Sequence, residues 1–280
     1  MKQLLILCVI AIISAEESKK NESKCEGIHV RNKFHRKQVL GIGLNRPYQL
    51  SYDQSEHRVY FSYNVGKDDE DSFEIGYLIK GHHDHKVLKT VENGFATAID
   101  NKNGILYIGS NEGIFKKHLK VNGSKVERVI SNHNVWDIFF KDHLYFITYP
   151  AQHLYKIVTE KEKKIAERQK HIHEKIYQFA IDGDSDMYIT NDTGLFRIKN
   201  GTNKRIWYEG PTIYRAIEIN KKGIAHFSAS NAIYVPNKGN HSLEKIAHIK
   251  NLFGITFDSD DNIIYSDPHE IVKLLPEDCK

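Results

Sequence analysis

The sequence predicts an all-β fold, a β-propeller of six blades in which every blade is a four-stranded antiparallel sheet. Three observations predict this fold. One unit of short strands recurs six times along the chain, at intervals typical of propeller blades. The composition, with 15 Tyr and only 2 Met, favours strands over helices. An extra strand near the N-terminus can complete the last blade and so close the ring.

The repeating unit is clearest between Asn93 and Lys117. Its first strand is FATAI, which the turn DNKNG joins to a second strand, ILYIGS. A further turn, NEG, leads to a third strand, IFKKHL, and KVERVI (residues 125–130) follows as a fourth. Four antiparallel strands of this length make one blade of a propeller.

Each unit has an equivalent residue at which the first strand ends and a turn begins. These residues are Asp53, Asp100, Lys141, Asp182, Asn220 and Asp258, at intervals of 38 to 47 residues. Such intervals are close to the roughly 40 to 50 residues expected for one blade. Second and third strands follow in all six units, and a fourth strand can be recognised in five of them.

The sixth unit reaches the end of the chain before its fourth strand. The run RKQVLGI (residues 36–42) has the same alternation as the other fourth strands and precedes the first unit. We expect it to form the outer strand of the last blade, so that the two ends of the chain lie side by side. The predicted organisation is a signal peptide over 1–15, an N-terminal arm over 16–35 and the propeller domain over 36–280.

The first 15 residues have the pattern of a secretory signal peptide. A single Lys precedes an apolar run from Leu4 to Ile13, and the small residues Ser14 and Ala15 follow. The apolar run is shorter than the roughly 20 residues that a membrane-spanning helix needs. We therefore expect a secreted, extracellular protein that is not anchored in a membrane.

Two cysteines remain after Cys8 leaves with the signal peptide. They are Cys25 and Cys279, one near each end of the chain. Two cysteines in an oxidising compartment favour a disulfide, the alternative being two separate thiols. A bridge across so long a loop would stabilise the fold by roughly 5 kcal/mol on the chain-entropy model.

Other surface features bear on export and partners. The formal net charge of +4 is small and spread over many acidic residues, which gives no indication of nucleic-acid binding. Five glycosylation sequons are present, at Asn21, Asn122, Asn191, Asn200 and Asn240. All but Asn191 lie in predicted arms or hairpin turns, where glycans are tolerated.

The first strands of a propeller surround its central channel, so the residues that begin them surround a channel mouth. Reading this position across the six units gives Tyr48, Phe95, Trp136, Tyr177, Arg215 and Phe253. Arg46 just before Tyr48, and Tyr149 at the end of a second strand, lie at the same rim. Aromatic faces with a cation suit a planar, partly anionic small molecule, although aromatic residues also pack between blades.

The sequence carries no nucleophile motif, no H-E-x-x-H and no P-loop, and it predicts no catalytic residue, metal ligand or cofactor. The segment DGDSD (Asp182 to Asp186) begins like a calcium loop but lacks the required Gly and Glu, which favours a hairpin turn. The His82 to His85 tract is expected on a solvated outer turn. Asp137 and Asp267 keep open a calcium-dependent lactonase or esterase, because enzymatic propellers of the gluconolactonase type hold a cation at the channel mouth.

Several segments are similar to one known family. They are NRPYQLSYD (45–53), NGFATAID (93–100), YIGSNEGIF (107–115), VWDIFFKDHLYF (135–146) and FGITFDSDDNIIYSD (253–267). They resemble the ommochrome-binding proteins of insect haemolymph, and the resemblance extends over nearly the whole mature chain, including its two cysteines. It implies a secreted carrier, not an enzyme, for planar phenoxazinone pigments such as xanthommatin. The alternatives are the lactonase and an extracellular protein-interaction propeller.

Overall fold

The computed structural model describes residues 26–67 and 70–278. In these two ranges the chain forms 25 β-strands and no helix, and hence no helix long and apolar enough to cross a membrane. The predicted signal peptide, both ends of the proposed disulfide (Cys25 and Cys279) and the Asn21 sequon lie outside the described residues.

Four of the sheets are separate, antiparallel and four-stranded, as the repeat predicts. The first contains β3 (Tyr48–Asp53), β4 (Arg58–Asn64), β5 (Phe73–Leu78) and β6 (His85–Val87). The second contains β7 (Gly94–Asp100), β8 (Ile105–Ser110), β9 (Gly113–His118) and β10 (Val126–Ser131). The third contains β11 (Val135–Lys141), β12 (His143–Thr148), β13 (Leu154–Glu160) and β14 (Lys163–Arg168). The fourth contains β15 (Gln178–Ile181), β16 (Met187–Asn191), β17 (Gly194–Ile198) and β18 (Arg205–Tyr208).

The remaining strands form one nine-stranded sheet instead of two separate blades. One side of it contains β19 (Tyr214–Ile219), β20 (Ala225–Ala229), β21 (Ala232–Asn237) and β22 (Ser242–His248). The other side contains β2 (Lys33–Gly41), β25 (Ile271–Pro276), β24 (Ile263–Ser266) and β23 (Gly254–Phe257), and β1 (Gly27–Val30) lies between the two sides. The connection is narrow, since β1 pairs with β22 only through Val30 and Ala247.

The N-terminal strand joins the last strand of the chain, as the missing sixth-unit strand predicts. His35 to Gly41 pairs antiparallel with Pro276 to Ile271. Residues 27–30 and 33–35, which were expected in an arm, form β1 and the beginning of β2. The β1–β2 hairpin is therefore the physical reason that two predicted blades are joined into one sheet.

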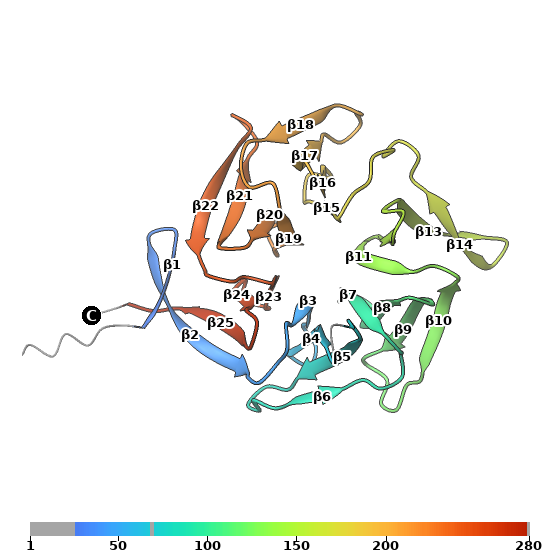
Figure 1. Cartoon of the computed structure of the whole chain (residues 1–280), viewed down its shortest axis with the longest axis horizontal. Coiled ribbons are helices and arrows are strands. Elements are labelled where there is room, and N and C mark those ends of the chain that lie inside the picture. Colours follow the sequence, from blue (N-terminus) through green and yellow to red (C-terminus); the bar gives the residue numbers. More distant parts are fainter. Residues whose placement is uncertain (1–25, 68–69, 279–280) are drawn as a thin grey trace, which may run out of the picture.

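Figure 1 shows the innermost strands β3, β7, β11, β15, β19 and β23 around one centre, with the blue N-terminal hairpin beside the red C-terminal strand. Each innermost strand contacts the next one along the chain, and β23 contacts β3. The all-β class and the four-stranded antiparallel sheets are thus confirmed.

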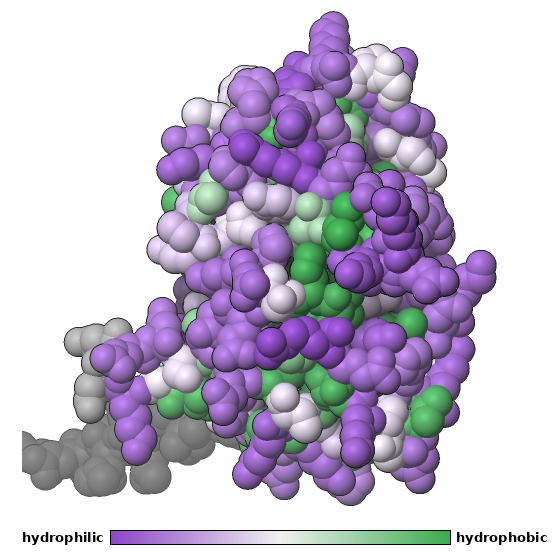
Figure 2. All heavy atoms as spheres, turned by 90° about the vertical axis from the view of Figure 1, so that its right-hand side faces the viewer, coloured by the Kyte–Doolittle hydropathy of each residue, from purple (hydrophilic) through white to green (hydrophobic). Residues whose placement is uncertain are grey.

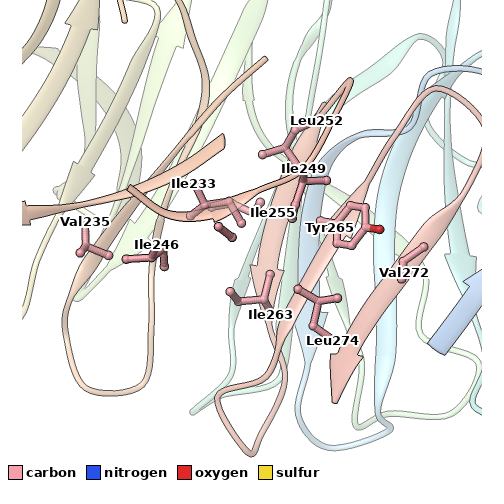
Figure 3. Packing of buried hydrophobic residues seen from close by; sticks show 11 residues of the cluster. Ile233, Val235, Ile246, Ile249, Leu252, Ile255, Ile263, Tyr265, Val272 and Leu274 are labelled. Carbon is pink, nitrogen blue, oxygen red and sulfur yellow. The ribbon is translucent and has the colours of Figure 1, made fainter. Parts of the chain in front are cut away.

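The hydrophobic core lies between neighbouring sheets. One cluster joins Ile233 and Ile246 on one side of the nine-stranded sheet with Ile255, Tyr265 and Leu274 on the other (Figure 3). Strands packed on both faces lose the usual alternation of buried and exposed residues, and β4 is buried at every position after Arg58. The side of the molecule in Figure 2 is mostly hydrophilic, with smaller hydrophobic areas among the polar side chains.

In five of the six units the repeated residue where the innermost strand ends is Asp or Asn, and its side chain builds the following turn; Lys141 is the exception, since its ammonium donates to the carbonyl oxygen of Asp182. The Oδ1 atom of Asp53 accepts from the backbone N–H of Ser55 at 3.0 Å, and Oδ1 of Asp258 accepts from Asp260 and Asn262 at 2.9 Å. Asp182 accepts from Asp184 and Asp186 in the same way. Short polar side chains that mimic a backbone turn are the reason that Asp and Asn recur here.

Three sequons lie at exposed positions of the structure, in turns between outer strands. These are Asn122, Asn200 and Asn240. Asn191 is the last residue of β16, where its Oδ1 accepts from the backbone N–H and the hydroxyl of Thr193.

Candidate functional site

A cavity of about 740 Å³ opens where the innermost strands begin. Seven of the eight residues that the sequence suggests as ligand contacts line it: Arg46, Tyr48, Phe95, Trp136, Tyr149, Arg215 and Phe253. They come from the N-terminal ends of β3, β7, β11 and β19, from the loops before β3 and β23, and from the loop after β12. Residues more than 200 positions apart in the sequence are therefore neighbours around one opening.

Five of these side chains form a continuous aromatic wall. Ring centroids lie 4.9 Å apart for Phe253 and Tyr48, and 6.0 Å apart for Tyr48 and Phe95. The wall continues from Phe95 to Trp136 at 5.2 Å and from Trp136 to Tyr149 at 5.8 Å, the last pair stacked at 29°. We call Phe253, Tyr48, Phe95, Trp136 and Tyr149 the aromatic wall.

β-Bulges explain why two residues of the aromatic wall, Phe95 and Trp136, leave their sheets. In β7 the register skips from Gly94 to Ala96, and in β11 it skips from Val135 to Asp137. The unpaired residues are Phe95 and Trp136. A bulge leaves its extra residue outside the ladder and turns its side chain in a new direction. Arg215 is the corresponding unpaired residue of β19, where the register skips from Tyr214 to Ala216.

The guanidinium of Arg215 lies over an aromatic ring and has an unused donor. Its Cζ atom is 4.3 Å from the centroid of Phe253, within cation–π distance. Its Nη1 atom is buried and has no hydrogen-bond partner among the described residues. A buried donor without a partner is costly, and an anionic or carbonyl oxygen in the cavity would satisfy it.

Tyr177 does not line this cavity, in contrast to the other seven residues. Its carbonyl oxygen accepts a 3.1 Å hydrogen bond from Nε1 of Trp136. The register of β15 with β16 is continuous and begins at Gln178, so no bulge turns Tyr177 inward. Gln178 lines the cavity in its place.

Further lining residues could not be recognised from the strand-start pattern. They are Gln49, Asp71, Phe73, Asn93, Asn111, Asn134, Gln178 and Tyr214. Phe73 extends the aromatic surface, with its ring centroid 4.7 Å from that of Phe95. Oδ1 of Asn93 accepts from the backbone N–H of Phe73 at 3.0 Å and so fixes its place. Asn93 and Asn134 do have a signal in the sequence, because each lies two positions before a residue of the aromatic wall, Phe95 or Trp136.

Two carboxylic acids lie on the innermost strands β11 and β19. Burial raises the pKa of Asp137 to about 7, against a smaller lowering by nearby polar groups of Phe179, Ile138 and Gln49. Burial, and then the charge of Asp137, raises the pKa of Glu218 well above its ordinary value. Glu218 lines a second cavity of about 390 Å³, at the opposite ends of the innermost strands.

The residues considered for a cation are dispersed. Asp137 is buried on β11, whereas Asp267 is in a turn, where its Oδ1 accepts from the backbone N–H groups of His269 and Glu270. Within 26–67 and 70–278 no group of three or more His, Cys, Asp or Glu residues is arranged to hold a metal ion. The DGDSD segment forms the β15–β16 turn, and the ammonium of Lys238 contacts Asp182, Asp184 and Asp186 at 2.5, 2.8 and 3.0 Å.

Comparison with curated proteins gives one informative relative. The ommochrome-binding protein of Manduca sexta is 29% identical to this chain over 253 residues, which cover 89% of this chain and 90% of that protein. The resemblance to the ommochrome-binding proteins is confirmed. No family model matches the chain.

Solved structures with the same fold have unrelated sequences. A gluconolactonase from Xanthomonas campestris superposes with a TM-score of 0.67 at 12% identity, over 91% of this chain and 96% of that one. A luciferin-regenerating enzyme gives a TM-score of 0.63 at 10% identity, over 86% and 95% of the two chains. The WD40 β-propeller domain of Doa1 gives 0.58 at 12% identity, over 90% and 98%. At such identities the likeness shows a propeller-like fold alone.

Proposed function

We propose that this protein is a carrier that binds a planar aromatic pigment, an ommochrome such as xanthommatin, in the 740 Å³ cavity. The observation that carries the proposal is the aromatic wall beside an arginine whose Nη1 lacks a partner among the described residues. The named relative, an ommochrome-binding protein, supports the same ligand class.

The cavity has the size and chemistry of a small-molecule site. Pockets for such ligands usually enclose about 300 to 1,000 Å³ and combine apolar walls with a few polar groups. In this proposal the flat ring system stacks on Phe95, Trp136 and Tyr149, while Tyr48 and Phe253 enclose it. Arg215 then pairs with a carboxylate or a polarised carbonyl of the ligand, and a charge-assisted hydrogen bond of this kind is strong when it is shielded from water.

We further propose that the chain is a closed propeller of six blades, in which the nine-stranded sheet counts as two. The contacts between consecutive innermost strands, including β23 with β3, support this count. The narrow β1–β22 connection supports it too, because β1 and β22 share a single ladder pair, Val30 with Ala247.

Export, the disulfide and the glycans belong to the same proposal. Arg36 pairs with Gly27 on one side and with Leu275 on the other, so the two ends of the described chain flank one residue of β2. Two strand spacings amount to about 10 Å. This proximity supports a bridge between Cys25 and Cys279. Peptide mapping without reductant would detect it and would also show which sequons carry glycans.

The binding test is a titration of the purified protein with xanthommatin, followed in the visible spectrum of the pigment. We expect saturable binding at micromolar concentration. Trp136→Ala and Arg215→Ala should each weaken it by about 1 to 3 kcal/mol, roughly 5- to 150-fold, since both contacts are shielded from water. Trp207→Ala is the matched control, because Trp207 is an exposed outer-strand residue outside the cavity. An unchanged pigment spectrum would contradict the proposal.

A metal-dependent lactonase is the second candidate, which the likeness of the fold to a gluconolactonase favours. It would need a cation held by Asp137, Asp267 or the asparagines of the mouth. Metal analysis and a lactone panel with and without a chelator would separate the two candidates. Turnover that disappears with the chelator would favour the enzyme, and pigment binding that is unaffected by the chelator would favour the carrier.

A further inference from the structure

The rim of the cavity carries a pair of opposite charges. Nη2 of Arg46 donates to Oδ1 of Asp71 at 2.9 Å, and both residues line the cavity. Ion pairs as exposed as this one usually contribute about 0 to 1 kcal/mol to stability. Stability therefore gives little reason for the pair, and its place at the mouth of the cavity points to a ligand.

Asp71 is held in place by a buried side chain. Nδ2 of Asn64, a residue that is only 5% exposed, donates to Oδ1 of Asp71 at 2.5 Å. Oδ1 of Asn64 accepts from the backbone N–H groups of Gly66 and Ser72 at 2.7 and 3.3 Å. The loop that carries Asp71 is thus fixed to the end of β4.

Arg46 is fixed to the same frame. Its backbone N–H donates to the carbonyl oxygen of Pro268 at 2.9 Å, and its φ of 49° lies in the left-handed region. That conformation costs a non-glycine residue on the order of 1 kcal/mol. The neighbouring Asn45 and Asn64 exchange hydrogen bonds, from N–H of Asn64 to the Asn45 carbonyl at 3.0 Å and from Nδ2 of Asn45 to the Asn64 carbonyl at 3.2 Å.

Three of the residues that line the cavity are charged: Arg46, Arg215 and Asp71. A complementary ligand has two groups rich in negative charge and one cationic group. Both described bonds to the Asp71 carboxylate fall on Oδ1, which leaves Oδ2 without a donor among the described residues. Burial raises the pKa of Tyr48, and the charges of Arg46 and Arg215 lower it, so the phenol is near both arginines.

We propose that Arg46 and Asp71 form a subsite for the α-amino-acid head group of an aromatic ligand. Asp71 takes the ammonium group through Oδ2, and Arg46 takes the carboxylate. Arg215, whose guanidinium lies over the ring of Phe253, holds an acidic or carbonyl oxygen of the ring system. This inference rests on the proposed function and names the head group that the same cavity selects.

Asp71 gives the subsite its selectivity. A ligand with acidic groups alone would be attracted by the two arginines and repelled by Asp71, whereas a zwitterionic head group satisfies both members of the pair. Neutralising the ligand amine removes its attraction to Asp71 and leaves the Oδ2 atom of that carboxylate covered without a donor. Such losses at charged hydrogen-bonded sites are among the larger ones measured in binding.

The test compares xanthommatin with its N-acetylated derivative, in which the amine is neutral and the chromophore is kept. The wild-type protein should bind the free amine about tenfold more tightly. Asp71→Asn keeps the shape of the side chain and should remove this preference. Arg215→Met should weaken both ligands equally, because it acts at the other end of the ring system.

Glu244→Gln is the matched control, because Glu244 forms a similarly exposed ion pair with Arg31 away from the cavity. It should leave both affinities unchanged. If the wild-type protein binds both pigments equally, the head-group subsite is wrong and the proposed function stands. If neither pigment binds, the proposed function and the subsite are both overturned.

Discussion

At the scale of single residues, the cavity contains a cation that the fold does not use. Arg215 stacks on Phe253 and leaves Nη1 unpartnered among the described residues. Arg197 differs in its charge partner: it is 5% exposed and its Nη1 pairs with Asp186 at 3.5 Å, while its Nε also lacks a hydrogen-bond partner among the described residues. One arginine is placed for a ligand, and the other belongs to the structure.

Arg215→Met should therefore separate binding from stability. We expect the free energy of unfolding to stay the same or to rise, since a costly unpartnered donor is removed, while pigment affinity falls about 5- to 150-fold. Arg197→Met should instead destabilise the protein by about 1 to 3 kcal/mol, because it removes one of the two cations that pair with the buried Asp186 and leaves Lys238 as the other. Urea unfolding and pigment titration of both variants check this, and a large loss of stability in Arg215→Met would contradict it.

Asp137 and Glu218 make stability depend on pH. Their folded-state pKa values lie above the ordinary ones, to about 7 for Asp137, so the native state holds protons that the unfolded state has released. Their contribution to stability is fully present below about pH 4 and is lost as pH rises, through about 7 for Asp137.

Glu218→Gln should raise the free energy of unfolding at pH 8 by about 1 to 2 kcal/mol and change it little at pH 5, because the ionised carboxylate no longer has to be buried. Urea unfolding at the two pH values measures this. Burial lowers the pKa of His226 to about 4, which reduces stability as pH falls below about 6.5. This effect is the same in the wild-type protein and in Glu218→Gln, so it cancels when the two are compared. The exposed Glu92→Gln is the control, and an equal gain at both pH values would contradict the account.

At the scale of elements, turns and bulges position the site. An Asp or Asn where five of the six innermost strands end builds the following turn. The bulges near the beginnings of β7, β11 and β19 turn Phe95, Trp136 and Arg215 out of their sheets. The β15–β16 turn also holds three carboxylates around the ammonium of Lys238, and Asp182 among them is 2% exposed.

Lys238→Met should destabilise the protein by about 2 kcal/mol at pH 7, since it removes the cation beside Asp182 and Asp184 and leaves Asp186 with Arg197 alone. The loss should be smaller at pH 3, because Lys238 helps to hold the pKa of Asp186 below its ordinary value, and stability from a lowered carboxyl pKa is lost as pH falls. Thermal unfolding at the two pH values measures the effect. Lys245→Met, on the neighbouring strand β22 at an exposed position, should change little. An equal loss at both pH values would contradict the electrostatic explanation.

The strands could be predicted because their turn residues recur at a nearly fixed interval. The cavity residues could be predicted because equivalent positions of the repeated units face one centre. Bulges have no comparable sequence signal, so the sequence did not distinguish Tyr177, which follows no bulge, from Phe95 and Trp136. The β1–β2 hairpin was missed for a related reason: it belongs to no repeat unit. Asp71 lies on the loop before β5, and Phe73 is the first residue of β5, the third strand of its sheet. Neither is at a position that the repeat compares.

At the scale of the whole molecule, the two ends of the chain are joined by β2 and β25. Deleting residues 26–41 should lower the melting temperature and cause association that depends on concentration, because β25 becomes a free edge. Differential scanning calorimetry and sedimentation velocity measure the two effects. A synthetic peptide of residues 33–41 should restore both, and a monomer with an unchanged melting temperature would contradict this role of β2.

The central claim is that a pigment binds against the aromatic wall, and the two tryptophans allow it to be tested directly. Trp207→Phe leaves Trp136 in the wall as the single tryptophan, and Trp136→Phe leaves Trp207 on the exposed outer strand β18. The measurement is tryptophan fluorescence of both variants during titration with xanthommatin. The account predicts strong, saturable quenching of Trp136 and much weaker quenching of Trp207. Equal quenching of both, or none, would contradict it.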